Sequence, residues 1–126
     1  TFQELGIIDP RSPAEEVVTV RGYSSLFRIL YNASYLSPES SEEVLKQLAQ
    51  TAYTKGLKAG VPASVEVAHK FGERELPDGK KQLHDCGIVF YPKNPYTLCI
   101  MTRGTDWEAL RTTIKEISKR VYQEVD

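Results

Sequence analysis

The residues best suited to chemistry lie in the stretch from Val65 to Gly104. There an apolar run ends in Lys70-Phe71-Gly72, which places a lysine and a glycine two residues apart. A lysine beside a cleft supplies a positive charge that attracts a carboxylate and lowers the pKa of a neighbouring nucleophile. A glycine lets the backbone and a ligand approach closely, because it carries no side chain. This triplet is therefore the first candidate site.

Two histidines and an aspartate lie close to the triplet in the sequence, at His69, His84 and Asp85. Imidazole and carboxylate groups bind metals, but three donors at unknown mutual distances do not define a metal site. We interpret them as satisfied polar residues at strand ends. We expect no metal and no other cofactor.

Two arginines, Arg74 and Arg103, lie near the ends of the first and third apolar runs. Either guanidinium is a candidate for anion binding in a cleft that includes Lys70, and Arg103 is the stronger of the two. The alternative is a solvated charge at a strand end, which is the ordinary position of an arginine.

Three apolar, β-prone runs must position the triplet, at residues 65–74, 83–92 and 96–104. A charged segment with Pro-Asp-Gly at 77–79 separates the first two runs, and Pro-Lys-Asn-Pro at 92–95 separates the last two. Both connections contain turn residues and are short enough for antiparallel neighbours. The sequence therefore predicts a three-stranded antiparallel sheet.

The chain before the sheet divides at about Tyr23. Residues 1–19 hold glycines, prolines and acidic residues with few apolar ones, which indicates an irregular packed loop with one short strand at Val17–Val20. From Tyr23 to Tyr35 the apolar positions recur at steps of one, three and four. That stripe predicts an amphipathic helix of about four turns.

A second helix is predicted immediately afterwards. Ser37 and Pro38 supply an N-cap and a proline at the first helical position, whereas Ser40 with Glu43 offers a capping box. One of these two signals starts a helix that ends near Tyr53. The two helices form a helical hairpin before the sheet.

A long helix is predicted after the sheet, with Thr105 and Glu108 as its capping box. Its apolar residues follow at spacings of three and four, at Trp107, Leu110, Ile114, Ile117, Val121 and Val125. Charged residues occupy the other side, so this helix should lie flat on the sheet. We therefore expect an α+β fold, with a three-stranded antiparallel sheet, a helical hairpin before it and a long helix packed on it, in a single domain over residues 1–126.

The two cysteines, Cys86 and Cys99, fall on neighbouring predicted strands. If Lys93 and Asn94 form the turn, the numbers of paired residues sum to about 187, two more than those of the cysteines. The cysteines would then share a face as diagonal neighbours. We predict two small buried hydrophobic residues, and a disulfide only after a shift of register.

The charge balance and hydropathy exclude two classes of partner. Sixteen lysines and arginines face 17 acidic residues, so the net charge of −1 gives no long-range attraction to nucleic acid or anionic lipid. No apolar run approaches the roughly 20 residues that span a bilayer, and the segment from Thr1 lacks the layout of a signal peptide. We expect no nucleic-acid partner and no membrane segment.

The order of elements and several motifs resemble the C-terminal part of the serine β-lactamase and penicillin-binding protein superfamily. The motifs are Gly60-Val-Pro62, Val67-Ala-His-Lys70-Phe-Gly72, His84-Asp-Cys-Gly-Ile-Val89 and a third strand that ends in Met101-Thr-Arg-Gly104. Similarity to the class A branch runs from about Gly22 to the C-terminus. It is most specific over residues 57–104.

The resemblance implies roles for the triplet and its neighbours. In the family a Lys-Thr-Gly or Lys-Ser-Gly triplet lies on the strand that borders the active site, and Lys70, Phe71 and Gly72 are similar to it in position. The residue after the glycine, Glu73, would lend its backbone N–H to an oxyanion hole. Phe71 and Arg103 would contact the substrate.

Two features depart from the family pattern. Phe71 stands where the family has a hydroxyl residue that binds a substrate carboxylate. No serine in this sequence is followed by a lysine three residues later, and no Ser-Asp-Asn occurs. The family's deacylating carboxylate also stays unassigned, because Glu4, Glu15 and Glu16 do not fit its pattern.

The resemblance implies the C-terminal part of a penicillin-recognising serine hydrolase, inactive alone because the nucleophile motif is absent. The complete domain would form an acyl-enzyme with a β-lactam or a D-alanyl-D-alanine amide, in the periplasm or outside the cell. One alternative is a catalytically dead relative that serves as a binding or interaction module, and another is an unrelated α+β domain. In a fragment, an exposed sheet edge should favour a homodimer or strand exchange.

Overall fold

The computed structural model describes residues 19–125. Its elements are α1 (Val20–Asn32), α2 (Pro38–Ala49), the 3-10 helix η1 (Leu57–Gly60), β1 (Val67–Glu75), β2 (Lys81–Val89), β3 (Tyr96–Gly104) and α3 (Trp107–Glu124). The strands are antiparallel and lie in the order β1-β2-β3. The predicted α+β architecture is confirmed. The loop predicted over residues 1–19 lies outside the described residues except for Thr19. The strand predicted at residues 17–20 is described only at Thr19, the N-cap of α1, and Val20, its first residue, and there the prediction was wrong.

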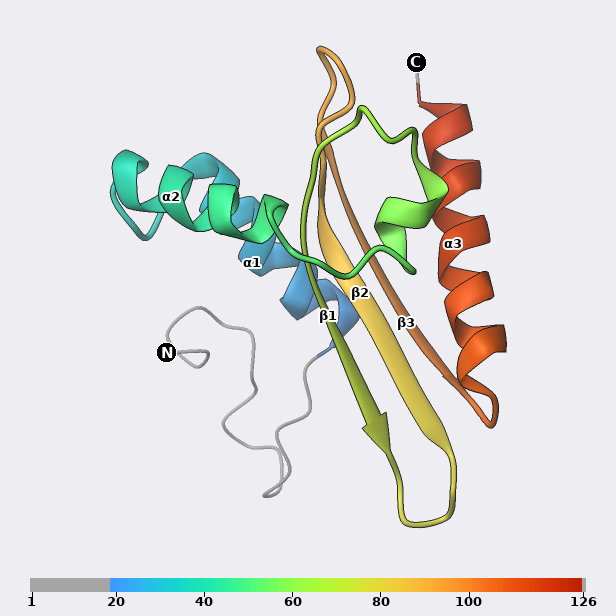
Figure 1. Ribbon diagram of the computed structural model, residues 1–126. Coiled ribbons are helices and arrows are strands. Elements are labelled where there is room, and N and C mark those ends of the chain that lie inside the picture. Colours follow the sequence, from blue (N-terminus) through green and yellow to red (C-terminus); the bar gives the residue numbers. More distant parts are fainter. Residues whose placement is uncertain (1–18, 126) are drawn as a thin grey trace.

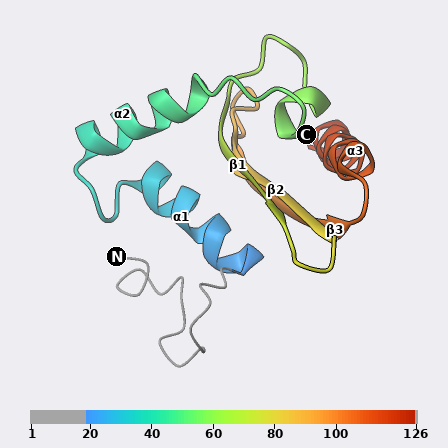
Figure 2. The same ribbon diagram turned by 60° about the horizontal axis from the view of Figure 1, so that its bottom comes forward.

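The sheet separates two helical layers. Helices α1 and α2 cover one face, whereas η1 and α3 cover the other (Figures 1 and 2). Two apolar clusters fill the two spaces. The cluster on the α3 face contains Leu57, Val61, Val65, Val67, Leu83, Val89, Ile100, Leu110 and Ile114, and the smaller cluster on the α1 face contains Phe27, Cys86 and Ile88.

Strand β1 sends its side chains alternately to the two faces, as a pleated strand must. Val67 and Phe71 pack in the cluster on the α3 face. Lys70 and Gly72 therefore lie on the α1 face. This alternation decides which predicted site residues share a surface.

Helix α1 begins three residues earlier than predicted and ends before Tyr35. Thr19 caps it, because its Oγ1 accepts a hydrogen bond from the N–H of Gly22 at 3.0 Å. The helix ends at Asn32, since Ala33 takes a left-handed conformation with φ 50°. A side-chain cap and a backbone reversal set these ends, and an apolar stripe reports neither.

Helix α2 uses the first of its two predicted starts. The hydroxyl of Ser37 accepts a hydrogen bond from the N–H of Ser40 at 3.2 Å, and Pro38 is the first helical residue. The helix ends at Ala49, so Tyr53 lies in the connection to η1 and not in the predicted helix.

Helix α3 lies against β2 and β3 as predicted. Its N-cap residue and one of the residues on its buried face differ from the prediction. The N-cap is Asp106 and not Thr105, because the Asp106 carboxylate accepts from the N–H of Glu108 at 3.2 Å. Ile117 is 40% exposed, whereas Ser118 is fully buried. Ser118 faces η1, where its hydroxyl donates to the carbonyl of Leu57 at 2.8 Å.

The turn between β2 and β3 is centred one residue earlier than predicted. The N–H of Asn94 donates to the carbonyl of Tyr91 at 3.0 Å, and Lys93 has a φ of 64°. Pro92 thus occupies the second position of the turn, where its fixed φ is favourable.

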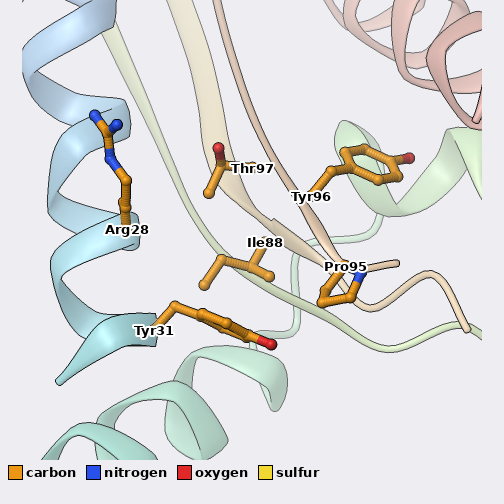
Figure 3. A pocket seen from close by; sticks show the side chains of 6 residues that line it. All are labelled: Arg28, Tyr31, Ile88, Pro95, Tyr96 and Thr97. Atoms are coloured by element: carbon orange, nitrogen blue, oxygen red, sulfur yellow. The ribbon is translucent and has the colours of Figure 1, made fainter. Parts of the chain in front are cut away.

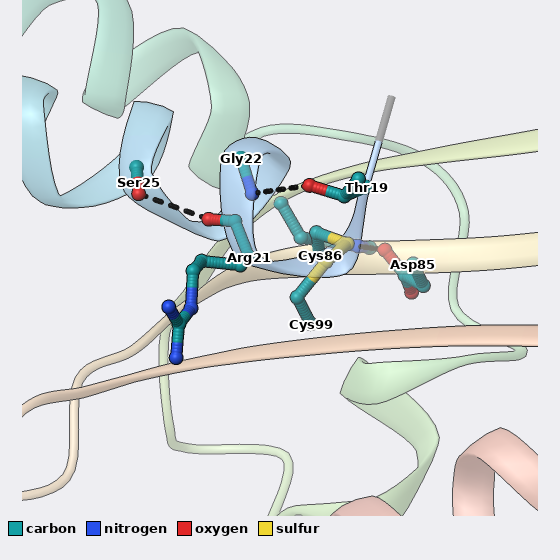
Figure 4. The surroundings of a disulfide bond; sticks show 8 residues. Thr19, Arg21, Gly22, Ser25, Asp85, Cys86 and Cys99 are labelled. Carbon is teal, nitrogen blue, oxygen red and sulfur yellow. Dashed lines mark hydrogen bonds and ion pairs between the residues drawn. A yellow bond between two sulfur atoms is a disulfide. The ribbon is translucent and has the colours of Figure 1, made fainter. Parts of the chain in front are cut away.

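This shift places Cys86 directly opposite Cys99, and the two form a disulfide (Figure 4). The prediction of diagonal neighbours without a disulfide was wrong, because it depended on the wrong turn centre. The bond joins β2 to β3 on the face covered by α1, next to Phe27.

Candidate active site

Strand β1 is an edge strand of the described sheet, so every second residue has backbone groups that β2 does not use. The carbonyl of Glu66 accepts from the N–H of Phe90 at 3.0 Å, which marks Glu66 as pointing toward β2. Residues an even number of places further along repeat that orientation. The backbone groups of Lys70 and Gly72 are therefore used within the sheet.

The intervening residues direct their backbone groups away from the sheet. The carbonyl of His69 accepts from Oγ1 of Thr51, outside the sheet, at 3.2 Å. By the same alternation the N–H and C=O of Phe71 and Glu73 point to the free edge. A backbone donor at Glu73 and the side chains of the triplet thus occur on the same stretch of edge.

Lys70 is exposed, and its side chain folds along this edge. Its Nζ donates to the carbonyl of Phe71 at 2.7 Å and lies 5.1 Å from the centroid of the Phe71 ring. The ammonium is therefore held beside the free backbone groups.

Phe71 lies on the opposite face of β1 from Lys70. Its ring stacks on Tyr53, with centroids 3.9 Å apart and planes inclined by 12°. Burial raises the pKa of the Tyr53 hydroxyl, with a smaller contribution from the negative charge of Asp85. The connection after α2 thus supplies an aromatic wall that the sequence analysis did not identify.

Gly72 is needed because the imidazole of His84 lies against it. A Cβ at Gly72 would be 2.4 Å from Cε1 and 2.6 Å from Nε2 of His84, its partner on β2. The glycine at position 72 therefore leaves space for the imidazole of His84. The signal was present in the sequence, because a turn centred on Asp78 pairs these two residues.

His84 has a pKa below its ordinary value of 6.5. Burial is the main cause and the charge of Lys70 adds to it, whereas Asp85 opposes the shift. The ring of Tyr23 on α1 contacts the imidazole edge-on, with centroids 5.4 Å apart. A neutral imidazole is therefore favoured on the same face as Lys70.

The depressed pKa predicts how stability changes with pH. The unfolded chain binds the proton of His84 more tightly than the folded chain, so this residue lowers the free energy of unfolding as the pH falls below 6.5. Above that pH it has no such effect. Urea unfolding measures the free energy of unfolding at about pH 7.5 and about pH 5. Its decrease between these two pH values should be larger for the wild type than for His84→Gln. Equal losses would contradict the shift.

Arg103 lies on a different strand from Lys70, whereas Arg74 lies on the same strand and the same face as Lys70. Arg103 lies on β3, the other edge strand, opposite Gln82. With the amide oxygen of Gln82 turned toward it, the guanidinium donates at 3.2 Å from Nε and 2.7 Å from Nη2. Arg74 is exposed on β1, where it pairs with Gln82 across the β1–β2 ladder, so Gln82 lies between the two arginines. The structure does not bring Arg103 next to Lys70, although both side chains are on one face, and its role in substrate binding stays a prediction.

A buried polar network lies beneath the triplet, on the α3 face. Nδ1 of His69 donates to Oδ1 of Asp85 at 2.9 Å, and the N–H of Leu57 donates to Oδ2 at 2.9 Å. Asp85 is 0% exposed and His69 is 1% exposed. The network connects β1, β2 and η1 on the face of the sheet opposite Lys70.

The three side chains considered as metal ligands, His69, His84 and Asp85, do not point to a common centre. His69 and Asp85 bond to each other, whereas His84 lies on the opposite face of the sheet. Within residues 19–125, no group of three or more histidine, cysteine or acidic side chains is placed to hold a metal ion. No helix in that range is long and apolar enough to cross a membrane.

A separate cleft of about 350 Å³ opens between α1 and the start of β3 (Figure 3). It is lined by Arg28, Tyr31, Ile88, Pro95, Tyr96 and Thr97. None of these residues belongs to β1, and none is a histidine, a cysteine or a carboxylate. The edge of β1 is therefore the candidate active site.

An edge strand with a cation, a glycine and an outward N–H has parts that acyl-group chemistry requires. The chain belongs to the β-lactamase enzyme family, because the model of that family, Beta-lactamase2, matches residues 3–125. No curated protein matches the chain.

Solved structures show the same fold. A class A β-lactamase from Bacteroides cellulosilyticus DSM 14838 matches with a TM-score of 0.82 and 23% identity, over 97% of this chain and 50% of that one. PBP-A matches with a TM-score of 0.77 and 24% identity, over 97% and 48%. A PBP-A mutant solved as an acyl-enzyme complex with penicillin G gives 0.78 and 23%, over 97% and 48%. The chain thus spans about half the length of the solved structures that it matches.

Proposed function

We propose that this chain forms one wall of the active site of a penicillin-recognising serine hydrolase. Lys70 supplies the positive charge, Gly72 allows close approach, and the backbone N–H of Glu73 donates to the oxyanion of an acyl substrate. The substrate is a β-lactam or a D-alanyl-D-alanine amide. The attacking serine comes from a segment outside these 126 residues, because none of their serines is followed by a lysine three residues later.

The free edge of β1 is the observation that carries this proposal. The N–H of Glu73 points away from β2, and Nζ of Lys70 lies beside it through its hydrogen bond to Phe71. A donor that is already oriented costs no reorganisation when negative charge develops on a carbonyl oxygen. The acyl-enzyme of the PBP-A mutant with penicillin G supports this substrate class.

A fluorescent penicillin tests whether this chain binds the substrate while the nucleophile lies outside it. We expect the 126-residue chain to show no covalent label on a denaturing gel, whereas unlabelled penicillin G should shift the NMR signals of Lys70 to Glu73. Covalent labelling of this chain would refute the external nucleophile. Unchanged signals at saturating penicillin G would refute penicillins as the substrate class of this edge.

Phe71→Thr tests the missing hydroxyl. We expect penicillin G to bind about fivefold more tightly to this variant than to Phe71→Val, because threonine and valine have nearly the same shape and differ by one hydrogen bond of about 1 kcal/mol. Calorimetric titration measures both constants. The valine variant controls for loss of the stack on Tyr53, and equal affinities would contradict a carboxylate site at this position.

A second candidate function is a catalytically dead binding or interaction module. The stack of Phe71 on Tyr53 favours it, because an apolar wall replaces a carboxylate-binding hydroxyl. A module of this kind would use its sheet edges to form a homodimer or exchange strands. Light scattering distinguishes a monomer from a dimer, and a Ser-x-x-Lys motif upstream in the gene would argue for the enzyme.

A further inference from the structure

His84 is the one histidine that reaches the surface at the candidate site. The other histidine, His69, is 1% exposed and bonded to Asp85. His84 projects from the central strand β2 and lies across Gly72 on the edge strand. Its ring is thus carried toward the free edge of the sheet.

In the described part of the chain, one aromatic ring contacts the imidazole of His84 and its nitrogen atoms form no hydrogen bond. Tyr23 contacts it edge-on from α1, with planes inclined by 62°. Within residues 19–125, no group forms a hydrogen bond with the imidazole of His84. An acceptor nitrogen and two exposed cations therefore share one face, since Lys70 and Arg74 are the diagonal neighbours of His84 across the β1–β2 ladder.

The charges around His84 come from three strands. Burial is the main effect that disfavours the imidazolium, and the charge of Lys70 on β1 adds to it, whereas Asp85, on β2 and directed to the other face, favours it. Arg103 on β3 shares the face of His84 but bonds to Gln82. Tyr23 on α1 has a pKa raised by burial and stays neutral beside the ring. The balance favours a neutral imidazole, the form that accepts a proton.

We propose that His84 is the proton acceptor of the candidate site. This proposal rests on the proposed function, because it requires an acyl group at the edge formed by Lys70 and Glu73. It supplies the base that the sequence comparison leaves unassigned.

The step is a general-base hydrolysis of an ester or acyl-enzyme. A nitrogen of His84 takes a proton from water while the water oxygen forms a bond to the acyl carbon. The bond from that carbon to the leaving oxygen then breaks, and the leaving oxygen recovers the proton from His84. The products are a carboxylic acid and an alcohol, and no other reactant is consumed.

Hydrolysis of p-nitrophenyl acetate by the 126-residue chain tests the proposal without a nucleophilic serine. We expect a rate above the buffer rate that falls at least about tenfold in His84→Gln. The double variant His84→Gln/Gln82→His carries an imidazole one rung further along the same face and should not recover the rate. Retention of the rate in His84→Gln, or its recovery in the double variant, would overturn the proposal.

The pH profile separates a chemical role from a structural one. The rate should rise to a plateau with a midpoint below 6.5, and Lys70→Met should move that midpoint upward because it removes the neighbouring charge. NMR titration of the His84 ring in the folded wild type and in Lys70→Met gives the same midpoints, so the test survives if His84→Gln does not fold. A midpoint at or above 6.5, or one that Lys70→Met leaves in place, would overturn the proposal.

Penicillin G distinguishes this proposal from the proposed function. If His84 hydrolyses the ester but penicillin G shifts no signal at Lys70 to Glu73, the assignment of His84 stands and the substrate class is wrong. If penicillin G shifts those signals but His84→Gln keeps the ester rate, only the assignment of His84 is overturned.

Discussion

Asp85→Ala is expected to lower the free energy of unfolding by about 3–5 kcal/mol, because two buried donors lose their acceptor together. The carboxylate accepts from His69 on one oxygen and from the N–H of Leu57 on the other, both at 2.9 Å. Asp85 is 0% exposed, so water does not replace it. Urea unfolding followed by the fluorescence of Trp107, the single tryptophan, measures the loss.

Two variants control this result. Asp78→Ala removes an exposed carboxylate that accepts from the N–H of Lys80 at 3.0 Å, and it should change stability by no more than about 0.5 kcal/mol. Asp85→Asn keeps one acceptor oxygen, so its loss in free energy of unfolding should lie between those of Asp85→Ala and Asp78→Ala. If Asp85→Ala resembles Asp78→Ala, the buried network does not hold η1 to the sheet.

Gly60→Ala is the second large loss, expected at about 3 kcal/mol from overpacking. A Cβ at Gly60 would be 2.6 Å from the carbonyl oxygen of Lys115 and 2.6 Å from the backbone nitrogen of Lys119. Both are backbone atoms of α3, so relief requires η1 and α3 to move apart. That movement would also stretch the hydrogen bond from Ser118 to Leu57.

Gly104→Ala is the matched control for Gly60→Ala. Its Cβ would meet only the side chain of Leu110, at 3.1 Å from Cδ2, and a leucine side chain adjusts by small rotations. We expect a change of less than about 1 kcal/mol. Thermal unfolding of both variants by circular dichroism gives the comparison, and similar losses would contradict close packing of η1 against α3.

The alternation of β1 explains how one strand serves the core and the candidate site. Residues that point to the α3 face, such as His69 and Phe71, pack against Asp85 and Tyr53. Those between them, Lys70 and Gly72, face α1 and His84. A one-residue slip of β1 would exchange these two sets, so both the core contacts and the proposed chemistry depend on the register of β1 against β2.

The amino-acid sequence by itself determined the family and the order and type of the three α-helices and three strands, but not η1. Three alternating apolar runs, two capped helices and a long amphipathic helix are local patterns, and each reports the periodicity of its own segment. Capping signals placed the start of α2 at either Ser37 with Pro38 or Ser40 with Glu43, and the structure has the first of these. The Lys70-Phe71-Gly72 triplet with the surrounding motifs indicated the β-lactamase family before any contact was known.

The tertiary structure alone decided which residues meet across elements. A turn centred one residue earlier than predicted pairs Cys86 with Cys99, and packing against η1 buries Ser118 while Ile117 stays exposed. The stack of Tyr53 on Phe71 likewise joins two segments that no turn pairs. Local periodicity fixes the face of a residue within its own element, whereas register and packing between elements depend on the conformation of the connections and on steric fit.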